Sequence, residues 1–276
     1  MVLVVVDLEK YFARIGWDGG RAPTLETFRS LHRAHVIGIP FENLDVVAGG
    51  VPSLDLDDLQ AKLVESARGG YCFEHNSLFG AVLEQLGFQV TRLSGRVRYG
   101  ARPGEERPRT HMVLAVEIPG VPGRYLADVG FGGLGALLEP LPMVPGQVNE
   151  AGGRRHRLVV EETEGWAPVW VMQAFRGGVW EDQTAFTLDR VPVPDLKLGN
   201  WFTATHPRSP FHRLFVQRTF ATGHHLLLDT KTVTRTGPDG AVHHEQIEDP
   251  DELLRLLESD FGIAPPANLR LPADVA

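Results

Sequence analysis

The chain has almost no cysteine: Cys72 is the only one among 276 residues. A lone cysteine excludes an intrachain disulfide and fits a reducing compartment such as the cytoplasm. Basic residues are outnumbered, with 27 Lys and Arg against 35 Asp and Glu and a formal net charge of −8. The chain therefore lacks the basic footprint that is typical of nucleic-acid-binding proteins.

Long hydrophobic runs are missing as well. No stretch approaches the length of a transmembrane helix, and the apolar run at residues 1–6 is too short for the core of a signal peptide. We therefore expect a soluble cytoplasmic protein without a membrane or nucleic-acid partner. Two short basic clusters, at Arg96–Arg109 and Arg154–Arg157, are interpreted as solvated loops, although either can help to attract a phosphorylated cofactor.

The pattern along the chain divides it into three parts. Residues 1–87 predict helices, with Asp7, Thr24 and Asp55 as N-terminal caps. Residues 88–194 predict short strands at 88–99, 110–118, 124–129, 157–160 and 169–175, separated by glycine and proline, which is typical of a small barrel or a strongly curled antiparallel sheet. A proline-rich stretch at Val191–Asp195 indicates a boundary. Residues 195–276 predict further strands, among them 225–229 and 232–236, and a last helix capped by Asp249.

The residues around Cys72 are typical of an activated nucleophile. Gly69 and Gly70 permit a tight turn, and apolar residues at helical spacing follow as far as Leu86. Cys72 is then expected in the first turn of a helix, where the backbone N–H groups favour a thiolate. The competing interpretation is a small buried hydrophobic residue.

A nucleophilic cysteine needs a histidine base and a group that orients the base. His111 begins an alternating strand, and Asp128 lies within an apolar strand that follows it, where an unpaired carboxylate is costly. His75 is close in sequence but is expected to point sideways from the helix. Taken singly, His111 is equally consistent with a core histidine and Asp128 with a strand-end residue, so the hypothesis depends on the three together.

The strand pairing makes this hypothesis testable. If a four-residue loop joins the two strands, Ile118 faces Gly123 and His111 faces Gly130. Asp128 is then the diagonal neighbour of His111 on the same face, about 7–8 Å away between backbones. A shift of one residue would place the two side chains on opposite faces.

Five segments of the chain resemble the arylamine N-acetyltransferase family. They are Ile39–Leu44 (IPFENL), Arg68–Asn76 (RGGYCFEHN), Thr110-His111, Asp128–Gly133 (DVGFGG) and Asn200–Phe211 (NWFTATHPRSPF). They occur in the family's order over nearly the whole chain. The resemblance implies an α+β fold with an N-terminal helical bundle, a central antiparallel β-barrel and a C-terminal α/β lid. The first two parts would carry a core similar to that of cysteine proteases and transglutaminases.

The resemblance also implies an activity, which is ping-pong transfer of an acetyl group from acetyl-CoA to an arylamine or hydrazine, without a metal. Cys72, His111 and Asp128 would form the catalytic triad. The implied substrate-binding residues are aromatic: Phe41, Tyr71, Phe131 and Phe202. The implied coenzyme A contacts are Gly130, Gly132, Gly133, Thr203, Thr205 and Ser209.

Other functions share some of these features. An amide synthase of the same fold would release a polyketide thioester as an amide, and a hydrolase or transglutaminase would use the same triad. A non-enzymatic interaction module would leave Cys72 unreactive. A zinc site built from His224-His225 and His243-His244 is disfavoured, because adjacent histidines on a strand point to opposite faces.

Overall fold

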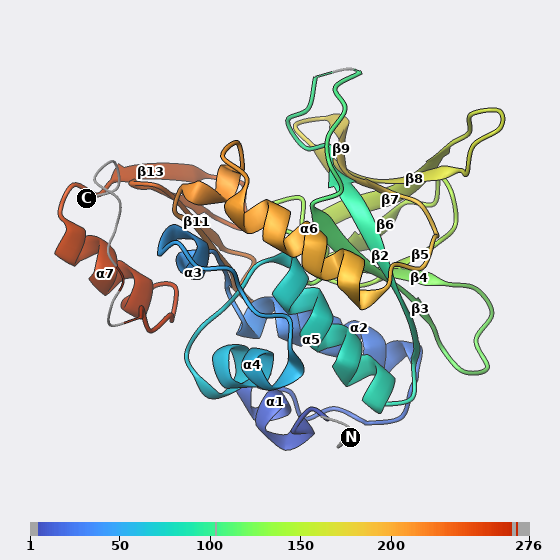
Figure 1. The fold of residues 1–276 in the computed structure, drawn as a ribbon, viewed down its shortest axis with the longest axis horizontal. Helices are drawn as coiled ribbons and strands as arrows, with labels where there is room; N and C mark the ends of the chain where they lie inside the picture. Colours follow the sequence, from blue (N-terminus) through green and yellow to red (C-terminus); the bar gives the residue numbers. More distant parts are fainter. Residues whose placement is uncertain (1–4, 103, 267–268, 270–276) are drawn as a thin grey trace.

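The computed structural model describes residues 5–102, 104–266 and 269. Figure 1 shows helices at the bottom, an antiparallel barrel at the right and a smaller sheet with one helix at the left. A long helix, α6 (Val193–Thr205), crosses between these parts. Of the apolar run at residues 1–6, only Val5 and Val6 lie within the described residues.

The first two helices begin where the sequence predicts. Helix α1 (Leu8–Ile15) is capped by Asp7, whose side chain accepts from the Lys10 N–H, and ends at Gly16 with φ of 63°. Helix α2 (Leu25–Gly38) is capped by Thr24. In both cases a side-chain oxygen satisfies an N–H group that the helix itself cannot pair.

The next segment is less regular. It contains α3 (Leu44–Val47), α4 (Leu56–Leu59) and a π-helical stretch, η1 (Gln60–Glu65). Asp55 precedes α4 as predicted, but its side chain makes no capping bond. Its carboxylate instead pairs with Lys197 Nζ at 2.8 Å, an ion pair between exposed side chains.

Helix α5 (Cys72–Gln85) begins at the cysteine. Its side chains are mostly buried, and it packs on the strands β2 (Gln89–Val97) and β3 (His111–Glu117) of the barrel. The predicted stop is confirmed, because Gly87 follows the helix with φ of 92°, a conformation that glycine adopts without strain.

Eight strands form the antiparallel barrel sheet in the order β5-β4-β3-β2-β9-β8-β7-β6. Their bounds are β2 (Gln89–Val97), β3 (His111–Glu117), β4 (Tyr125–Ala127), β5 (Leu141–Pro142), β6 (Asn149–Ala151), β7 (Arg154–Glu161), β8 (Val169–Arg176) and β9 (Val179–Phe186). A bridge between Pro145 and Leu158 brings the segment after β5 next to β7, so the sheet is nearly closed.

The register between β3 and β4 is the predicted one. Val116 faces Tyr125 and Leu114 faces Ala127. Continuing this pairing places His111 opposite Gly130, with Asp128 as its diagonal neighbour. Strand β3 is buried on both faces, so the predicted alternation of buried and exposed side chains is absent, and the short connection between β3 and β4 sets which side chains share a face.

The smaller sheet has the order β1-β10-β11-β12-β13. Its strands are β1 (Phe41–Glu42), β10 (Phe215–Thr219), β11 (His225–Asp229), β12 (Thr232–Thr236) and β13 (Val242–Gln246). Helix α7 (Pro250–Ser259) covers it with Leu253 and Leu257. Strand β1 comes from the N-terminal part of the chain, so the first and last parts share a sheet.

Helix α6 (Val193–Thr205) begins two residues before the predicted boundary at 194/195, and a 3₁₀ turn, η2 (Pro210–His212), follows it. Pro194 lies in the first turn of α6, where proline costs no hydrogen bond. The proline-rich stretch is thus the start of a helix.

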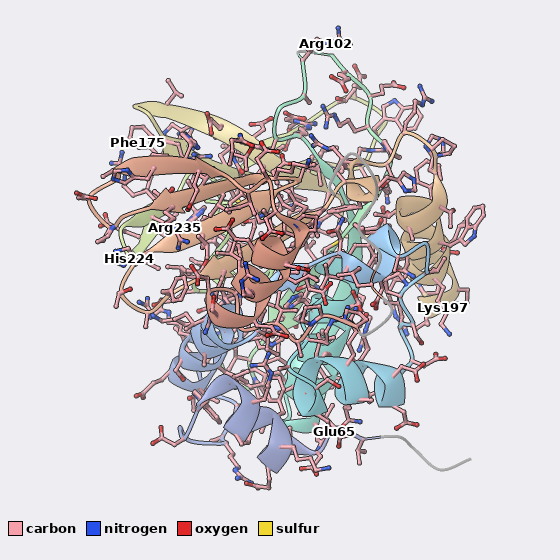
Figure 2. All side chains as sticks on the ribbon, turned by 90° about the vertical axis from the view of Figure 1, so that its left-hand side faces the viewer. Glu65, Arg102, Phe175, Lys197, His224 and Arg235 are labelled. Atoms are coloured by element: carbon pink, nitrogen blue, oxygen red, sulfur yellow. The ribbon has the colours of Figure 1, made fainter. Side chains whose placement is uncertain are left out.

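Charged side chains lie on the outside of the molecule, among them Glu65, Arg102 and Lys197, which Figure 2 labels. The main apolar core lies between the helices and the barrel and includes Phe28, Phe79 and Leu114. Among the described residues, no helix has the length and apolar character needed to cross a bilayer.

Candidate active site

Cys72 is the first residue of α5 and is 3% exposed. Positions 69 and 70 have to be glycine, because neither has room for a side chain. A Cβ on Gly69 would lie 1.9 Å from the Pro40 carbonyl oxygen, and one on Gly70 would lie 2.7 Å from a Glu74 carboxylate oxygen. Neither glycine has a positive φ, so close approach, and not the special turn we expected from the sequence, explains them.

His111 and Asp128 form a short buried pair. His111 Nε2 lies 2.6 Å from Asp128 Oδ2, and the two residues are 3% and 1% exposed. Burial alone would lower the pKa of His111, but the charges of Asp128 and Cys72, with hydrogen bonds to both, raise it to about 10. Because Asp128 bonds Nε2 of His111, Nδ1 is the ring nitrogen that is available to Cys72. The Cys72 sulfur also lies 3.7 Å from the Thr110 carbonyl oxygen.

The Asp128 carboxylate has further donors besides His111. Its Oδ1 accepts from Asn76 Nδ2 at 3.0 Å and from the Gly130 N–H at 3.1 Å. The Asp128 backbone N–H donates to Nε2 of His32 at 3.3 Å, and burial lowers the pKa of His32 to about 4. A neutral imidazole is needed for that contact, because a protonated ring has no acceptor nitrogen.

His75 is engaged elsewhere, as we expected. Its Nδ1 lies 2.9 Å from His35 Nε2, and its Nε2 lies 3.2 Å from the Pro40 carbonyl oxygen. Tyr11 in turn lies 2.7 Å from His35 Nδ1. Burial lowers the pKa of His75 to about 4 and that of His35 well below its usual value, so this row of side chains is neutral and joins α1, α2 and α5.

An ion-pair network supports the turn before Cys72. Arg68 bonds Glu42 and Asp45, and Lys62 bonds Asp45 and Glu74. The second oxygen of Glu74 accepts from the Tyr71 N–H at 3.0 Å, directly before the cysteine. These contacts hold the first turn of α5 in place.

The glycine-rich loop after Asp128 packs directly on Cys72. A Cβ on Gly130 would lie 2.6 Å from the Cα of Cys72, and one on Gly132 would lie 2.8 Å from Gln217 Nε2. Gly133 has φ of 136°, which strains any other residue. The loop therefore lies directly against the backbone of Cys72.

The predicted aromatic residues fall into separate groups. The Phe131 ring meets the His111 ring edge-on at 5.5 Å. Phe41 and Tyr71 both contact Phe211, with ring centroids at 6.1 and 5.6 Å. Tyr71 is fully buried, and its hydroxyl bonds Asn200 of α6. Phe202 stacks on His206 at 4.4 Å, and no ring contact within the described part of the chain joins it to the others.

The predicted hydroxyl contacts for coenzyme A lie at the end of α6. Thr203 donates to the Gly199 carbonyl oxygen and Thr205 to that of Trp201, at 2.7 and 2.8 Å. Ser209 donates to the Thr203 carbonyl oxygen. Because each hydroxyl hydrogen is used within the chain, these side chains can offer a ligand only acceptor positions.

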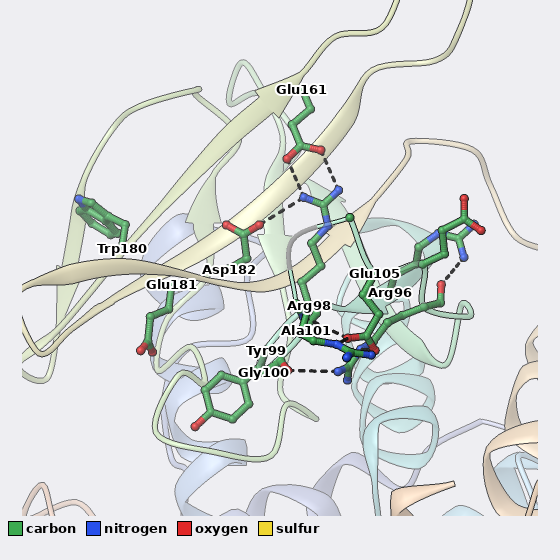
Figure 3. A pocket seen from close by; sticks show the side chains of 14 residues that line it. Arg96, Arg98, Tyr99, Gly100, Ala101, Glu105, Glu161, Trp180, Glu181 and Asp182 are labelled. Carbon is green, nitrogen blue, oxygen red and sulfur yellow. Dashed lines mark hydrogen bonds and ion pairs between the residues drawn. The ribbon is translucent and has the colours of Figure 1, made fainter. Parts of the chain in front are cut away.

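The first basic cluster borders a cavity of about 1020 Å³ between the β2–β3 loop and β9 (Figure 3). Arg98 donates to both carboxylate oxygens of Glu161, at 2.6 and 2.7 Å, and lies 3.2 Å from Asp182. Arg107 pairs with Glu105 at 2.9 Å. Since carboxylates outnumber arginines on this wall, it lacks the excess positive charge that a phosphate site needs.

The histidine pairs considered for zinc bond threonines. His225 contacts Thr219, and His244 contacts Thr234. Within residues 5–102, 104–266 and 269, no group of three or more His, Cys, Asp and Glu side chains could hold a metal ion.

Two residues near Cys72, His111 and Asp128 were not predicted from the sequence. Asn76 donates a hydrogen bond to Asp128. The sequence feature that could have identified Asn76 is its position one helical turn after Cys72. Gln217 is 3% exposed, lies beside Gly132, and has no hydrogen-bond partner on either amide atom among the described residues. Nothing in the local sequence pattern of β10 distinguishes it.

Comparison with known proteins identifies close relatives. A model of the N-acetyltransferase family matches residues 24–269. An arylamine N-acetyltransferase of Mycolicibacterium smegmatis is 43% identical over 211 residues, which are 75% of this chain and 74% of that protein. One of Escherichia coli (strain K12) is 37% identical over 257 residues, which are 93% of this chain and 88% of that protein.

Solved structures agree over nearly the whole length. The arylamine N-acetyltransferase of M. smegmatis superposes with a TM-score of 0.90 at 37% identity, covering 99% of this chain and 98% of that chain. That of Mycobacterium marinum in complex with CoA gives a TM-score of 0.89 at 36% identity, covering 98% of both chains. The predicted α+β fold class with a cysteine-protease-like core is confirmed.

Proposed function

This chain belongs to the arylamine N-acetyltransferase family, and from that membership we propose that it transfers acetyl groups through Cys72, His111 and Asp128. It is an acyltransferase, with acetyl-CoA as the acetyl donor and an arylamine nitrogen as the acceptor. The finer mechanism below is argued from this chain's own side chains.

One observation carries the mechanism. The His111 ring lies between the Asp128 carboxylate, at 2.6 Å, and the Cys72 sulfur, and both raise the pKa of His111. An imidazolium near neutral pH is therefore favoured, and its charge supports a thiolate on Cys72 at the start of α5. This is the protonation state that a thioester-attacking nucleophile needs.

In the first half-reaction, the Cys72 thiolate attacks the thioester carbonyl carbon of acetyl-CoA. The carbon–sulfur bond to CoA breaks, and the departing CoA sulfur takes the proton of the His111 imidazolium. Backbone N–H groups in the first turn of α5 stabilise the oxyanion. The products are an acetyl-cysteine and a neutral imidazole.

Acetylation itself prepares the second half-reaction. A thioester sulfur carries no negative charge, so the pKa of His111 loses one of the contributions that raise it. The neutral ring then accepts the proton of the amine as the amine nitrogen attacks the acetyl carbon. The acetyl–sulfur bond breaks, which restores the thiolate and the imidazolium.

The remaining site assignments belong to the same proposal. Phe41, Tyr71, Phe131 and Phe202 would recognise the aromatic amine, with Phe131 supported by its contact with the His111 ring. The loop glycines Gly130, Gly132 and Gly133, with Thr203, Thr205 and Ser209, would contact coenzyme A. The division at 1–87, 88–194 and 195–276 and a cytoplasmic location stay predictions from the sequence.

Mass spectrometry of the intact protein after mixing with acetyl-CoA alone tests the mechanism. We expect the mass to rise by one acetyl group, located on Cys72, because the first half-reaction needs no amine. Cys72→Ala should show neither the adduct nor acetyl transfer, with an unchanged melting temperature as the control for folding. Wild-type-like turnover by Cys72→Ala would end the proposal.

Adding an aromatic amine to the isolated acetyl-enzyme then tests the acceptor. Loss of the adduct with formation of the acetylated amine supports the family's activity. Loss of the adduct at the same rate in buffer without amine would instead indicate a hydrolase.

A further inference from the structure

Asn76 joins the three elements that carry the proposed triad. It lies on α5, four residues after Cys72, and is 0% exposed. Its Nδ2 donates to the Met112 carbonyl oxygen at 2.8 Å, next to His111 on β3, and to Asp128 Oδ1 at 3.0 Å. Its Oδ1 accepts from the Val129 N–H at 3.1 Å. One carboxamide thus bridges the helix, the strand and the loop after β4.

The orientation of this carboxamide is fixed by its partners. The Met112 carbonyl and the Asp128 carboxylate only accept, whereas the Val129 N–H only donates. A flipped amide would therefore lose all three bonds. The nitrogen has to face Asp128, and the donor to Oδ1 complements the His111 contact on Oδ2.

We propose that Asn76 is a positioning residue for acetyl transfer, which sets the Asp128 carboxylate and the His111 strand relative to the Cys72 helix. The inference rests on the proposed triad. Its physical basis is that Asp128 is 1% exposed, and a buried carboxylate needs donors on both oxygens to stay ionised and correctly oriented. Without Asn76, only the Gly130 N–H would remain on Oδ1.

Asn43 provides a matched control. It is 2% exposed and makes the same kinds of contact, with its Nδ2 donating to the carbonyl oxygens of Phe211 and Arg213 and its Oδ1 accepting from the Phe215 N–H. Asn43 directly follows β1 and links it to the segment from Phe211 to Phe215. It touches no member of the proposed triad. The two asparagines therefore have comparable structural roles and differ in the contact with Asp128.

The test compares Asn76→Asp with Asn43→Asp, since this nearly isosteric change replaces the donating nitrogen by an accepting oxygen. In Asn76→Asp the new oxygen faces two acceptors, Met112 O and Asp128 Oδ1. We expect the single-turnover rate of Cys72 acetylation to fall by about 100-fold, the scale of an ångström-sized misplacement. The lower limb of the pH profile for Cys72 alkylation by iodoacetamide should move to higher pH.

Asn43→Asp should lower the melting temperature but keep the wild-type alkylation profile. If Asn76→Asp does not fold, Asn76→Ser replaces it, because a hydroxyl keeps one donor, and the same profile shift is expected. Wild-type acetylation and alkylation in a folded Asn76 variant, or an equal profile shift in Asn43→Asp, overturns the inference. So does failure of both Asn76 variants to fold while Asn43→Asp folds, since the role would then be structural.

These results are separable from the proposed mechanism. If wild-type protein itself gains no acetyl group on Cys72, the proposed function fails. If wild-type protein is acetylated and the Asn76 variants match it, only the inference about Asn76 fails.

Discussion

Gly130 is the residue at which the loop after Asp128 touches Cys72. Its N–H donates to Asp128 Oδ1, and the position of its missing Cβ is 2.6 Å from the Cα of Cys72. It has no positive φ, so an alanine here is opposed by packing and not by backbone strain. The clash would be with a backbone atom of Cys72, so no side-chain rotation can relieve it.

Gly130→Ala is therefore expected to reduce acetyl transfer by about 100-fold, because the loop must move away from Cys72 and carries Asp128 with it. Steady-state kcat/KM for an aromatic amine measures the effect. Gly20→Ala is the control, since its Cβ would meet nothing closer than 4.0 Å and its φ is not positive. Equal activity of the two variants would show that the contact with Cys72 is unimportant.

At the scale of elements, Arg14 of α1 holds the segments beneath the cysteine turn together. Its guanidinium donates to the carbonyl oxygens of Gly38, Leu63 and Arg68, at 2.8, 3.1 and 3.2 Å. The Gly38 carbonyl is at the end of α2, and the Leu63 carbonyl lies within η1. The Arg68 carbonyl directly precedes the glycine pair before Cys72. A single planar group thus satisfies three backbone acceptors from three segments.

We expect Arg14→Met to lower the free energy of unfolding by about 2–4 kcal/mol, because it leaves these carbonyls without their charged donor. Urea denaturation followed by circular dichroism gives the value. Arg29→Met is the comparison, since Arg29 is half-exposed and lies 3.8 Å from Glu139. That change should cost less than about 0.5 kcal/mol, and a similar loss in both variants would contradict the bridging role of Arg14.

Elements with strong local signals were predicted well. The sequence indicated α1 and α2 through their caps, and β11 and β12 match the predicted bounds. Strand β9 was missed because Glu181, Asp182 and Gln183 interrupt its apolar pattern; it is a strand because it pairs with both β2 and β8. Such pairing is a property of the sheet and leaves little trace in the segment itself.

At the scale of the whole molecule, burial keeps several histidines neutral. Burial lowers the pKa of His32, His75 and His156 to about 4, that of His225 to about 3, and that of His35 well below its usual value. In the unfolded chain these groups titrate near 6.5. Between pH 6.5 and 4 the unfolded state therefore binds more protons, and protonation favours unfolding.

We therefore expect the free energy of unfolding to fall steeply as the pH is lowered from 6.5 to 4, by about 1.4 kcal/mol per pH unit for each such histidine. Glu74 offsets the contribution of one histidine. Burial raises the pKa of Glu74 to about 7, so the folded state holds the Glu74 proton in this pH range. Urea midpoints at a series of pH values give the slope.

His225→Gln isolates one contribution, since His225 is buried, lies in the smaller sheet and takes no part in the proposed triad. The slope should decrease by about 1.4 kcal/mol per pH unit. His111 affects the free energy of unfolding at higher pH. Its raised pKa contributes stability that is complete below pH 6.5 and is lost as the pH rises toward 10. A flat profile between pH 4 and 6.5 would show that these histidines are not kept neutral.

The sequence by itself predicted Cys72, His111 and Asp128 as one group and determined the strand register that brings His111 and Asp128 together, because both depend on short-range features: a helix start, an apolar strand and a short loop. Tertiary structure alone decided what surrounds them. Asn76, Gln217 and the contact of Gly130 with Cys72 depend on segments that are distant in sequence, and no local periodicity encodes which backbone atom a buried amide meets. That information exists only once the helices, the barrel and the lid are packed together.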